Sequence, residues 1–271
     1  MIPYIQPIFV PDEEHLEQNI DSIYSFGEYI KKYPFDILCA FGGYAKRDKW
    51  WTMISDVIEK NIPPDRILPI KKYNMNVGKG VVVNHLYTLL KEYDFDFFLT
   101  ADSDIKFTLD TPHLFERLGN IGKNFKKDTS QSLGFVSLQQ SGHCYHDIKK
   151  MTEQYFVSGD DDKKEKLVYS QTPGGIAGGC LFLCKAAWES VGGYQTKSVY
   201  GGHDGVLLGS MRSKKYACVI SPDISIFHPR SRVKNQEYHE LKSKLRKMFV
   251  NKKSKQQLKK VVDDFWDSQN E

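Results

Sequence analysis

The sequence predicts an α/β fold in which a mostly parallel sheet is flanked by helices, and three observations support this prediction. The 271 residues are 40% hydrophobic and 13% aromatic, which is enough for a sizeable core. Short apolar runs alternate with helical patterns through the first half of the chain, as in βαβ units. Residues 95–100, with the sequence FDFFLT, are nearly all apolar, as expected of a strand in the middle of a parallel sheet.

The first two strand–helix units follow directly from the apolar pattern. Residues 4–10 are expected to form a strand, and Asp12 is placed to cap the helix that follows it. The second strand is expected over residues 35–41 and to end at Gly42-Gly43, before a second helix. The apolar faces of the two helices are expected to contain Leu16, Ile20, Ile23 and Tyr24 in the first, and Trp50, Trp51, Ile54 and Ile58 in the second.

The middle of the chain continues this alternation and then becomes less regular. Residues 149–166 are polar, with three consecutive aspartates, and indicate a loop or a lid. The remaining elements are expected as strands at residues 66–70, 95–100, 133–138 and 179–184 and as a helix at residues 81–90.

Two amphipathic helices are expected to close the chain. The second begins at Ser254, where Gln257 lies three residues further on and completes a capping box. The apolar faces are expected to contain Tyr238, Leu241, Leu245 and Met248 in the first of these helices, and Leu258, Val261, Phe265 and Trp266 in the second.

Positive charge is concentrated near the end of the chain. Residues 230–260 contain 12 Lys or Arg and 2 Asp or Glu, so this segment carries +10 while the whole chain carries +4. The rest of the chain is therefore mildly acidic, at −6. We predict a main domain over residues 1–232 and a basic, amphipathic helical tail over residues 233–271 that packs on it. The role of the tail has three alternatives: it binds nucleic acid, it binds an anionic membrane, or its charges only solvate a helix face.

Composition also indicates the cellular compartment. No run of about 18 apolar residues predicts a membrane-spanning helix, and residues 1–9 lack the basic start and the cleavage site of a signal peptide. The 5 cysteines are scattered along the chain and are odd in number, which does not suit a disulfide framework. A reducing cytoplasm is the expected location.

An acidic motif follows the fourth expected strand. Asp102-Ser103-Asp104 comes at its carboxyl end, where ligands of open α/β sheets bind. Two carboxylates at this point suit Mg²⁺ or Mn²⁺, which in turn bridges diphosphate oxygens. The alternative is a solvated turn in which aspartate acts as a cap. Other nucleotide motifs are missing, since Tyr73 stands where a Walker A loop needs glycine and no G-x-G-x-x-G follows the first strand.

Five further segments accompany Asp102-Ser103-Asp104. In chain order the whole set is residues 73–80 with Asn84, residues 102–104, residues 173–184, residues 188–194, residues 200–204 and residues 227–230. Taken together and in this order, these segments resemble the motifs of inverting glycosyltransferases with the GT-A fold, in particular family 2 and the β-1,4-galactosyltransferases, and Asp102-Ser103-Asp104 matches their D-x-D motif. Two departures stand out. His203 replaces the usual Glu, and Phe41-Gly42-Gly43-Tyr44 stands where many members have an acidic segment that reads the base of the donor.

This resemblance implies a metal-dependent transfer of a sugar from a nucleotide-sugar donor, with uridine as the default base, to an acceptor hydroxyl. It makes residues 1–232 the catalytic domain and implies Mn²⁺ or Mg²⁺ as cofactor. Asp204 is the expected general base, the alternative being a cap for the helix expected near Val206. The other implied site residues are Asp102, Asp104 and His228 for the metal; Asn76, Lys79, Ser103, Gly174, Gly175, Gly178 and Gly179 for the donor; and Tyr200, His203, Arg230 and Arg232 for the acceptor.

The expected identity of the acceptor depends on what the basic tail binds. Bacteriophage enzymes that glycosylate hydroxymethylated cytosine in DNA are similar to this chain in size and in needing a basic surface, so duplex DNA is the leading hypothesis. A phage enzyme of this kind would act in the cytoplasm of the host. Saccharide or lipid-linked acceptors are the alternative, and a GT-A-like module that binds nucleotides or sugars without turnover is a third possibility.

Overall fold

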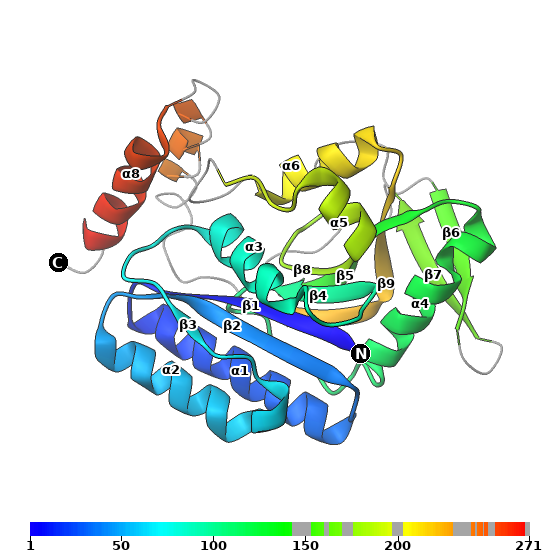
Figure 1. Cartoon of the computed structure of the whole chain (residues 1–271), viewed down its shortest axis with the longest axis horizontal. Helices are drawn as coiled ribbons and strands as arrows, with labels where there is room; N and C mark the ends of the chain where they lie inside the picture. The colour runs from blue at the N-terminus through cyan, green and yellow to red at the C-terminus, as the bar shows by residue number, and fades with distance from the viewer. Residues whose placement is uncertain are drawn as a thin grey trace.

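One mixed sheet runs through the computed structural model, with helices on both of its faces (Figure 1). Its strands are β1 (Ile2–Val10), β2 (Ile37–Ala45), β3 (Lys71–Lys72), β4 (Phe97–Ala101), β5 (Leu133–Gly142), β6 (Glu153–Ser158), β7 (Lys164–Tyr169), β8 (Cys180–Cys184) and β9 (Ala217–His228). The residues that the structure describes are 1–142, 153–159, 163–169, 176–196, 203–229, 240–241, 243–245, 247–248 and 253–268.

The strand order within the described residues is β3-β2-β1-β4-β8-β5-β9-β7-β6. The first four strands of this order are parallel to one another, as βαβ units require, and β5 and β9 are also parallel. Strand β8 is antiparallel to both of its neighbours, and β6 and β7 form an antiparallel hairpin that continues the sheet beyond β9. The predicted α/β fold class is confirmed.

The helices form a layer on each side of the sheet. Side chains of α1, α2 and α4, among them Ile23, Ile54 and Leu118, share one buried cluster with one face of the sheet. Side chains of α3, α5 and α6, among them Leu86 and Trp188, share a second cluster with the opposite face. The bounds are α1 (Glu13–Lys32), α2 (Asp48–Asn61), α3 (Lys79–Leu90), α4 (Leu114–Thr129), α5 (Lys185–Val191), α6 (His203–Ser213) and α8 (Lys255–Ser268), with a short 3₁₀ helix at Pro64–Arg66.

Several local predictions are confirmed at the level of single hydrogen bonds. The Asp12 carboxylate accepts a hydrogen bond from the backbone N–H of His15 at 2.9 Å, which makes it the N-cap of α1. Before α8, the backbone N–H of Ser254 donates to Gln257 Oε1 at 3.0 Å, and the N–H of Gln257 donates to Ser254 Oγ at 3.2 Å. These two bonds form the predicted capping box.

Strand β2 runs through Gly42-Gly43, so the prediction that these glycines end the strand is wrong. A Cβ atom on Gly43 would lie 1.9 Å from the backbone oxygen of Ile8 in β1. The glycine is needed for the close approach of two strands and not for a turn.

Other boundaries also differ from the prediction. The third strand lies at residues 71–72 and not at residues 66–70. Within residues 66–70 the chain makes an isolated bridge, between Ile67 and Cys39, but no strand. Tyr24 is 55% exposed and does not lie on the buried face of α1. The described part of residues 149–166 forms most of the β6–β7 hairpin instead of a loop, because an edge hairpin is solvated enough to have a polar sequence.

The tail is described only in part. Leu241 and Leu245 pack with Leu258 and Val262 of α8 in a third buried cluster, against which Phe9 at the end of β1 also packs. The predicted boundary between residues 232 and 233 lies outside the described residues.

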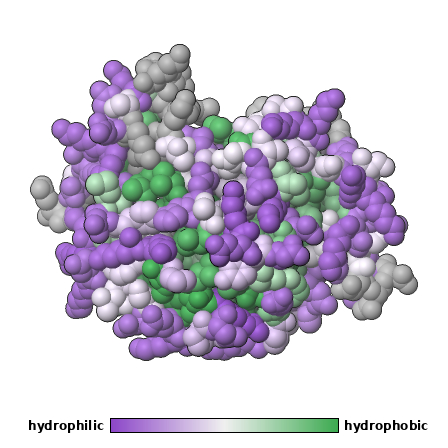
Figure 2. Space-filling view, viewed as in Figure 1, coloured by the Kyte–Doolittle hydropathy of each residue, from purple (hydrophilic) through white to green (hydrophobic). Residues whose placement is uncertain are grey.

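Figure 2 shows hydrophilic side chains over most of the face seen in Figure 1, with hydrophobic groups visible between them near its centre. Among the helices that the structure describes, none has both the length and the apolar character needed to cross a bilayer.

Candidate active site

The acidic motif lies where the sequence predicts it, directly after β4 and at the edge where the parallel strands end. The backbone N–H of Asp102 donates to the carbonyl oxygen of Gly179 at 2.7 Å, which joins the motif to the segment before β8. The side chains of Asp102 and Asp104 are 31% and 24% exposed, so both carboxylates can still meet a ligand.

A buried hydrogen-bond network holds the turn that carries these carboxylates. Gln6 of β1 accepts a hydrogen bond from the hydroxyl of Tyr4 at 3.0 Å and donates to Ser22 Oγ at 2.9 Å. The same amide donates to the carbonyl oxygen of Ser103 at 3.5 Å, and the Ser22 hydroxyl donates to the carbonyl oxygen of Ile105. Side chains of strand β1 and helix α1 therefore hold the backbone of the Asp102-Ser103-Asp104 turn in place by hydrogen bonds.

Lys79, the first residue of α3, joins two carboxylates that are distant in sequence. Its ammonium nitrogen Nζ lies 2.6 Å from Asp102 Oδ1 and 3.3 Å from Asp204 Oδ1. It also donates to the carbonyl oxygen of Gly178 at 3.3 Å. Burial disfavours the charged form, but Asp102 and Asp204 overcome this effect and raise the pKa of Lys79 well above its ordinary value.

Asp204 lies in the first turn of α6 and accepts a hydrogen bond from the hydroxyl of Tyr194 at 2.9 Å. Burial opposes its ionisation, yet the charge of Lys79 and the Tyr194 hydrogen bond together lower the pKa of Asp204. Burial, aided by the neighbouring carboxylates of Asp204 and Asp104, instead raises the pKa of Asp102. The single ammonium of Lys79 is thus paired with the carboxylates of Asp102 and Asp204, and the carboxylate of Asp104 lies nearby. This excess of negative charge suits the binding of a cation.

Gly178 allows the chain to pass close to Asp204. A Cβ atom at this position would lie 1.9 Å from Cγ and 2.3 Å from Oδ2 of Asp204. No other residue fits without displacing that carboxylate, so the glycine-rich segment before β8 has a definite steric role.

Asp104 and His228 form the pair that could hold a metal ion. Nε2 of His228, at the end of β9, lies 3.2 Å from Asp104 Oδ2, and Nδ1 of the same ring lies 3.0 Å from Gln140 Oε1. With Nδ1 donating to the Gln140 amide oxygen, Nε2 is the nitrogen that donates to Asp104, and loss of the Nε2 proton would free a lone pair for a metal ion. Two neighbouring ligand atoms of one Mg²⁺ or Mn²⁺ lie about 3 Å apart, so this pair fits such a cation.

The third predicted metal ligand is oriented differently. Asp102 contacts Lys79, and no group of three or more His, Cys, Asp or Glu side chains that could hold a metal occurs within the described part of the chain. Burial alone would raise the pKa of Asp104, but the hydrogen bond and charge of His228 lower it below its ordinary value. A direct role of Asp102 at the metal stays a prediction.

Replacing Gln140 by Leu should weaken the binding of Mn²⁺ about 10- to 100-fold, because the His228 ring would lose the hydrogen bond that orients it. Gln140 is fully buried, whereas Gln131 is exposed, so Gln131→Leu is the matched control. Titration calorimetry with MnCl₂ measures both variants. Unchanged affinity in a folded Gln140→Leu protein would remove the orienting role from Gln140.

The other predicted site residues are only partly brought together. Asn76 accepts a hydrogen bond from the backbone N–H of Gly78 at 3.0 Å and lines a separate pocket. Gly179 lies beside Gln140, and His203 is 2% exposed with its ring 5.9 Å from that of Tyr194. Gly174, Gly175, Tyr200, Arg230 and Arg232 lie outside the described residues.

Four residues that the sequence reasoning did not assign to the site belong to it: Gln6, Ser22, Gln140 and Tyr194. Tyr194 stands within one of the matching segments and could have been noticed there. The other three act through contacts between distant elements, which no local pattern indicates.

The sequence matches no protein-family model and no curated protein. The fold does match solved structures. The mannosyltransferase PcManGT from Pyrobaculum calidifontis, in complex with GDP-Man and Mn²⁺, aligns over 98% of this chain and 69% of its own, with a TM-score of 0.60 and 17% identity. Residues 1–349 of S. aureus TarS align over 84% of this chain and 60% of their own, with a TM-score of 0.56 and 11% identity.

A longer TarS structure aligns over 97% of this chain but 42% of its own length, with a TM-score of 0.56 and 12% identity. This chain therefore spans less than two thirds of both TarS structures. At these identities the likeness concerns the fold, which is of the GT-A type.

Proposed function

We propose that this chain is a metal-dependent inverting glycosyltransferase, which moves a sugar from a nucleoside-diphosphate sugar to an acceptor hydroxyl. The observation that carries the proposal is the meeting of Asp104, His228, Asp102, Lys79 and Asp204 at the carboxyl end of β4. The GT-A fold supports it, and so does the GDP-Man and Mn²⁺ complex of PcManGT, which suggests the class of donor and the cation.

Departure of the nucleoside diphosphate is the first step that the site must assist. Asp104 and His228 would hold the cation that binds the diphosphate. Asp102 would lie beside this diphosphate, with its carboxylate paired to the ammonium of Lys79. A bound Mn²⁺ or Mg²⁺ offsets the negative charge that grows on the diphosphate. The Gly178-Gly179 segment beside Asp102 allows the donor to approach the backbone.

Removal of the proton from the acceptor hydroxyl is the second step, and Asp204 is the proposed general base. The hydrogen bonds from Tyr194 and Lys79 both end on Oδ1, so within the described residues Oδ2 is the oxygen left for the hydroxyl. The lowered pKa of Asp204 keeps this carboxylate ionised at neutral pH. The Lys79 ammonium keeps the carboxylate in place.

A screen of nucleotide sugars tests the proposal. Wild-type protein with MnCl₂ should gain thermal stability from the true donor, because a ligand that binds only the folded state raises the melting temperature. The same donor should release its nucleoside diphosphate on incubation, either by transfer or by slow hydrolysis. Binding without any release would favour the non-catalytic alternative, and no binding of any nucleotide sugar would contradict the proposal.

Replacing Lys79 by Met should move the acid limb of the pH–rate profile to higher pH. Lys79 lowers the pKa of Asp204, so without it the carboxylate is protonated up to a higher pH and cannot accept a proton. Rates of nucleoside diphosphate release between pH 4 and pH 9 measure the effect, with the exposed Lys49→Met as control. An acid limb at the same pH in both variants would exclude Asp204 as the titrating base.

For the acceptor we propose duplex DNA that carries hydroxymethylated cytosine, acted on in the cytoplasm. The +10 charge of residues 230–260 supports a polyanion, because such a segment gains free energy by counterion release. Retention on duplex DNA should fall steeply as salt rises. Retention that is absent or insensitive to salt would favour a saccharide or lipid-linked acceptor.

A further inference from the structure

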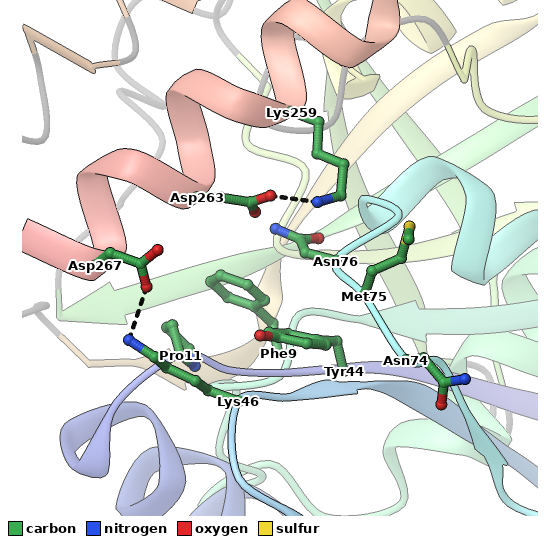
Figure 3. A pocket seen from close by; sticks show the side chains of 10 residues that line it. All are labelled: Phe9, Pro11, Tyr44, Lys46, Asn74, Met75, Asn76, Lys259, Asp263 and Asp267. Carbon is green, nitrogen blue, oxygen red and sulfur yellow. Dashed lines mark hydrogen bonds and ion pairs between the residues drawn. The ribbon is translucent and has the colours of Figure 1, made fainter.

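Helix α8 lines one side of a pocket at the carboxyl ends of β1 and β2 (Figure 3). The pocket has a volume of about 250 Å³. This is below the ~300 Å³ at which pockets for drug-sized ligands begin, so it suits one ring system better than a whole nucleotide sugar. The lining residues are Phe9, Pro11, Tyr44, Lys46, Asn74, Met75, Asn76, Lys259, Asp263 and Asp267.

Two kinds of contact hold α8 in this position. Lys46, just after β2, forms an ion pair of 2.8 Å with Asp267 of α8. Phe9, near the end of β1, packs against the cluster that contains Leu258 and Val262. The helix therefore forms a wall of the pocket.

The pocket lies beside the proposed active site. Strand β1 lies between β2 and β4, and Asp102 and Asp104 follow β4. Asn76 of the pocket lining accepts a hydrogen bond from the backbone N–H of Gly78, directly before Lys79, whose Nζ lies 2.6 Å from Asp102 Oδ1. A nucleotide whose diphosphate lies near Asp104 could therefore extend its base into the pocket.

The chemistry of the lining suits a purine with two adjacent N–H donors. Phe9 and Tyr44 offer aromatic rings, and Lys259 and Asp263 form an ion pair on the pocket side of α8. Asp263 and Tyr44 both line the pocket (Figure 3), and burial together with the Asp263 carboxylate raises the pKa of Tyr44. Asp263 is 36% exposed and Asp267 is 66% exposed, so Asp263 is the more sheltered of the two acids.

Guanine matches this pair of charges more completely than the other bases do. Its edge offers one carbonyl oxygen beside two N–H donors, which a lysine ammonium and a carboxylate can both satisfy. Uracil has a single N–H between two carbonyl oxygens, so the second carboxylate oxygen would face a carbonyl. Adenine and cytosine each place an acceptor nitrogen beside one amino group, and the carboxylate would satisfy only the latter.

We infer that α8 reads the base of the donor, that Asp263 together with Lys259 is its specificity-determining part, and that the base is guanine. This inference rests on the proposed function and deepens it. Strand β2 ends in Tyr44 and Ala45, so the strand itself contributes no carboxylate to the pocket. Here the carboxylate comes from a helix about 220 residues further along the chain.

Titration calorimetry of GDP, UDP, ADP and CDP, each with MnCl₂, tests the inference on the full chain. Wild type should bind GDP about 10- to 100-fold more tightly than UDP, as expected for hydrogen bonds to a charged group. Asp263→Asn should remove most of this preference and leave UDP binding within about 2-fold. Asp264→Asn makes the same charge change at an exposed neighbour outside the pocket lining and should change neither affinity.

The outcomes separate this inference from the proposed function. Equal binding of GDP and UDP by wild type, or an unchanged preference in a folded Asp263→Asn protein, would overturn the guanine assignment and leave the glycosyltransferase proposal intact. Absence of binding by all four nucleotides would overturn both. Circular dichroism of each variant confirms that α8 is still formed.

Discussion

Replacing Asp204 by Asn is expected to lower the rate of sugar transfer about 10²- to 10⁴-fold, because the acceptor hydroxyl would lose its proton acceptor. Asn keeps the size of the side chain and can still accept hydrogen bonds from Tyr194 and Lys79 on its amide oxygen. Donor binding should therefore remain close to that of wild type. Single-turnover rates with saturating donor, combined with calorimetric donor affinities, measure the two effects separately.

The alternative role of Asp204 is structural, since the residue lies in the first turn of α6. A structural role predicts a lower melting temperature together with weaker donor binding. Asp223→Asn is the control, because Asp223 is an exposed acid on β9. A transfer rate in Asp204→Asn equal to that of the control would exclude Asp204 as the base.

Replacing Asp104 by Ala is expected to abolish the Mn²⁺ dependence of nucleotide binding and to weaken this binding by about 100-fold or more, since the cation would lose a charged ligand. His228 would also lose its partner at 3.2 Å. Electron paramagnetic resonance of Mn²⁺ reports the metal directly, and calorimetry of GDP and UDP with and without MnCl₂ reports the nucleotide.

A matched control and a second variant define this test. Asp110→Ala removes an exposed acid a few residues further on and should leave Mn²⁺ binding unchanged. His228→Ala should weaken Mn²⁺ binding in the same direction as Asp104→Ala. If Asp104→Ala bound Mn²⁺ and nucleotide as tightly as Asp110→Ala does, the metal site would have to lie elsewhere.

Some elements that the sequence reasoning missed had a signal that could have been used. Helix α4 buries Leu114, Leu118, Ile121 and Phe125, whose spacing is that of a helix with one apolar face. The β6–β7 hairpin had a weaker signal, because an edge strand needs little apolar surface and Phe156 is 54% exposed. For such strands, pairing with neighbours decides the structure more than composition does.

Features that depend on near neighbours along the chain are predictable from the residues alone. Three such features were predicted, and the structure contains them: the apolar strand before Asp102-Ser103-Asp104, the Asp12 cap and the Ser254 capping box. These features follow from side-chain periodicity and from hydrogen bonds that span three or four residues. The net charge of +4 conceals a basic tail, and only the position of the charges revealed it.

Contacts between side chains that are distant in the sequence depend on how the chain folds. Lys79 lies between Asp102 and Asp204, and Gln140 forms a hydrogen bond with His228. Asp263 of α8 lines a pocket at the ends of β1 and β2. The order of strands in the sheet sets these contacts, and the spacing of residues in the chain does not specify that order. The physical reason is that hydrogen bonds and ion pairs act over a few ångströms in space, regardless of how far apart their partners lie in sequence.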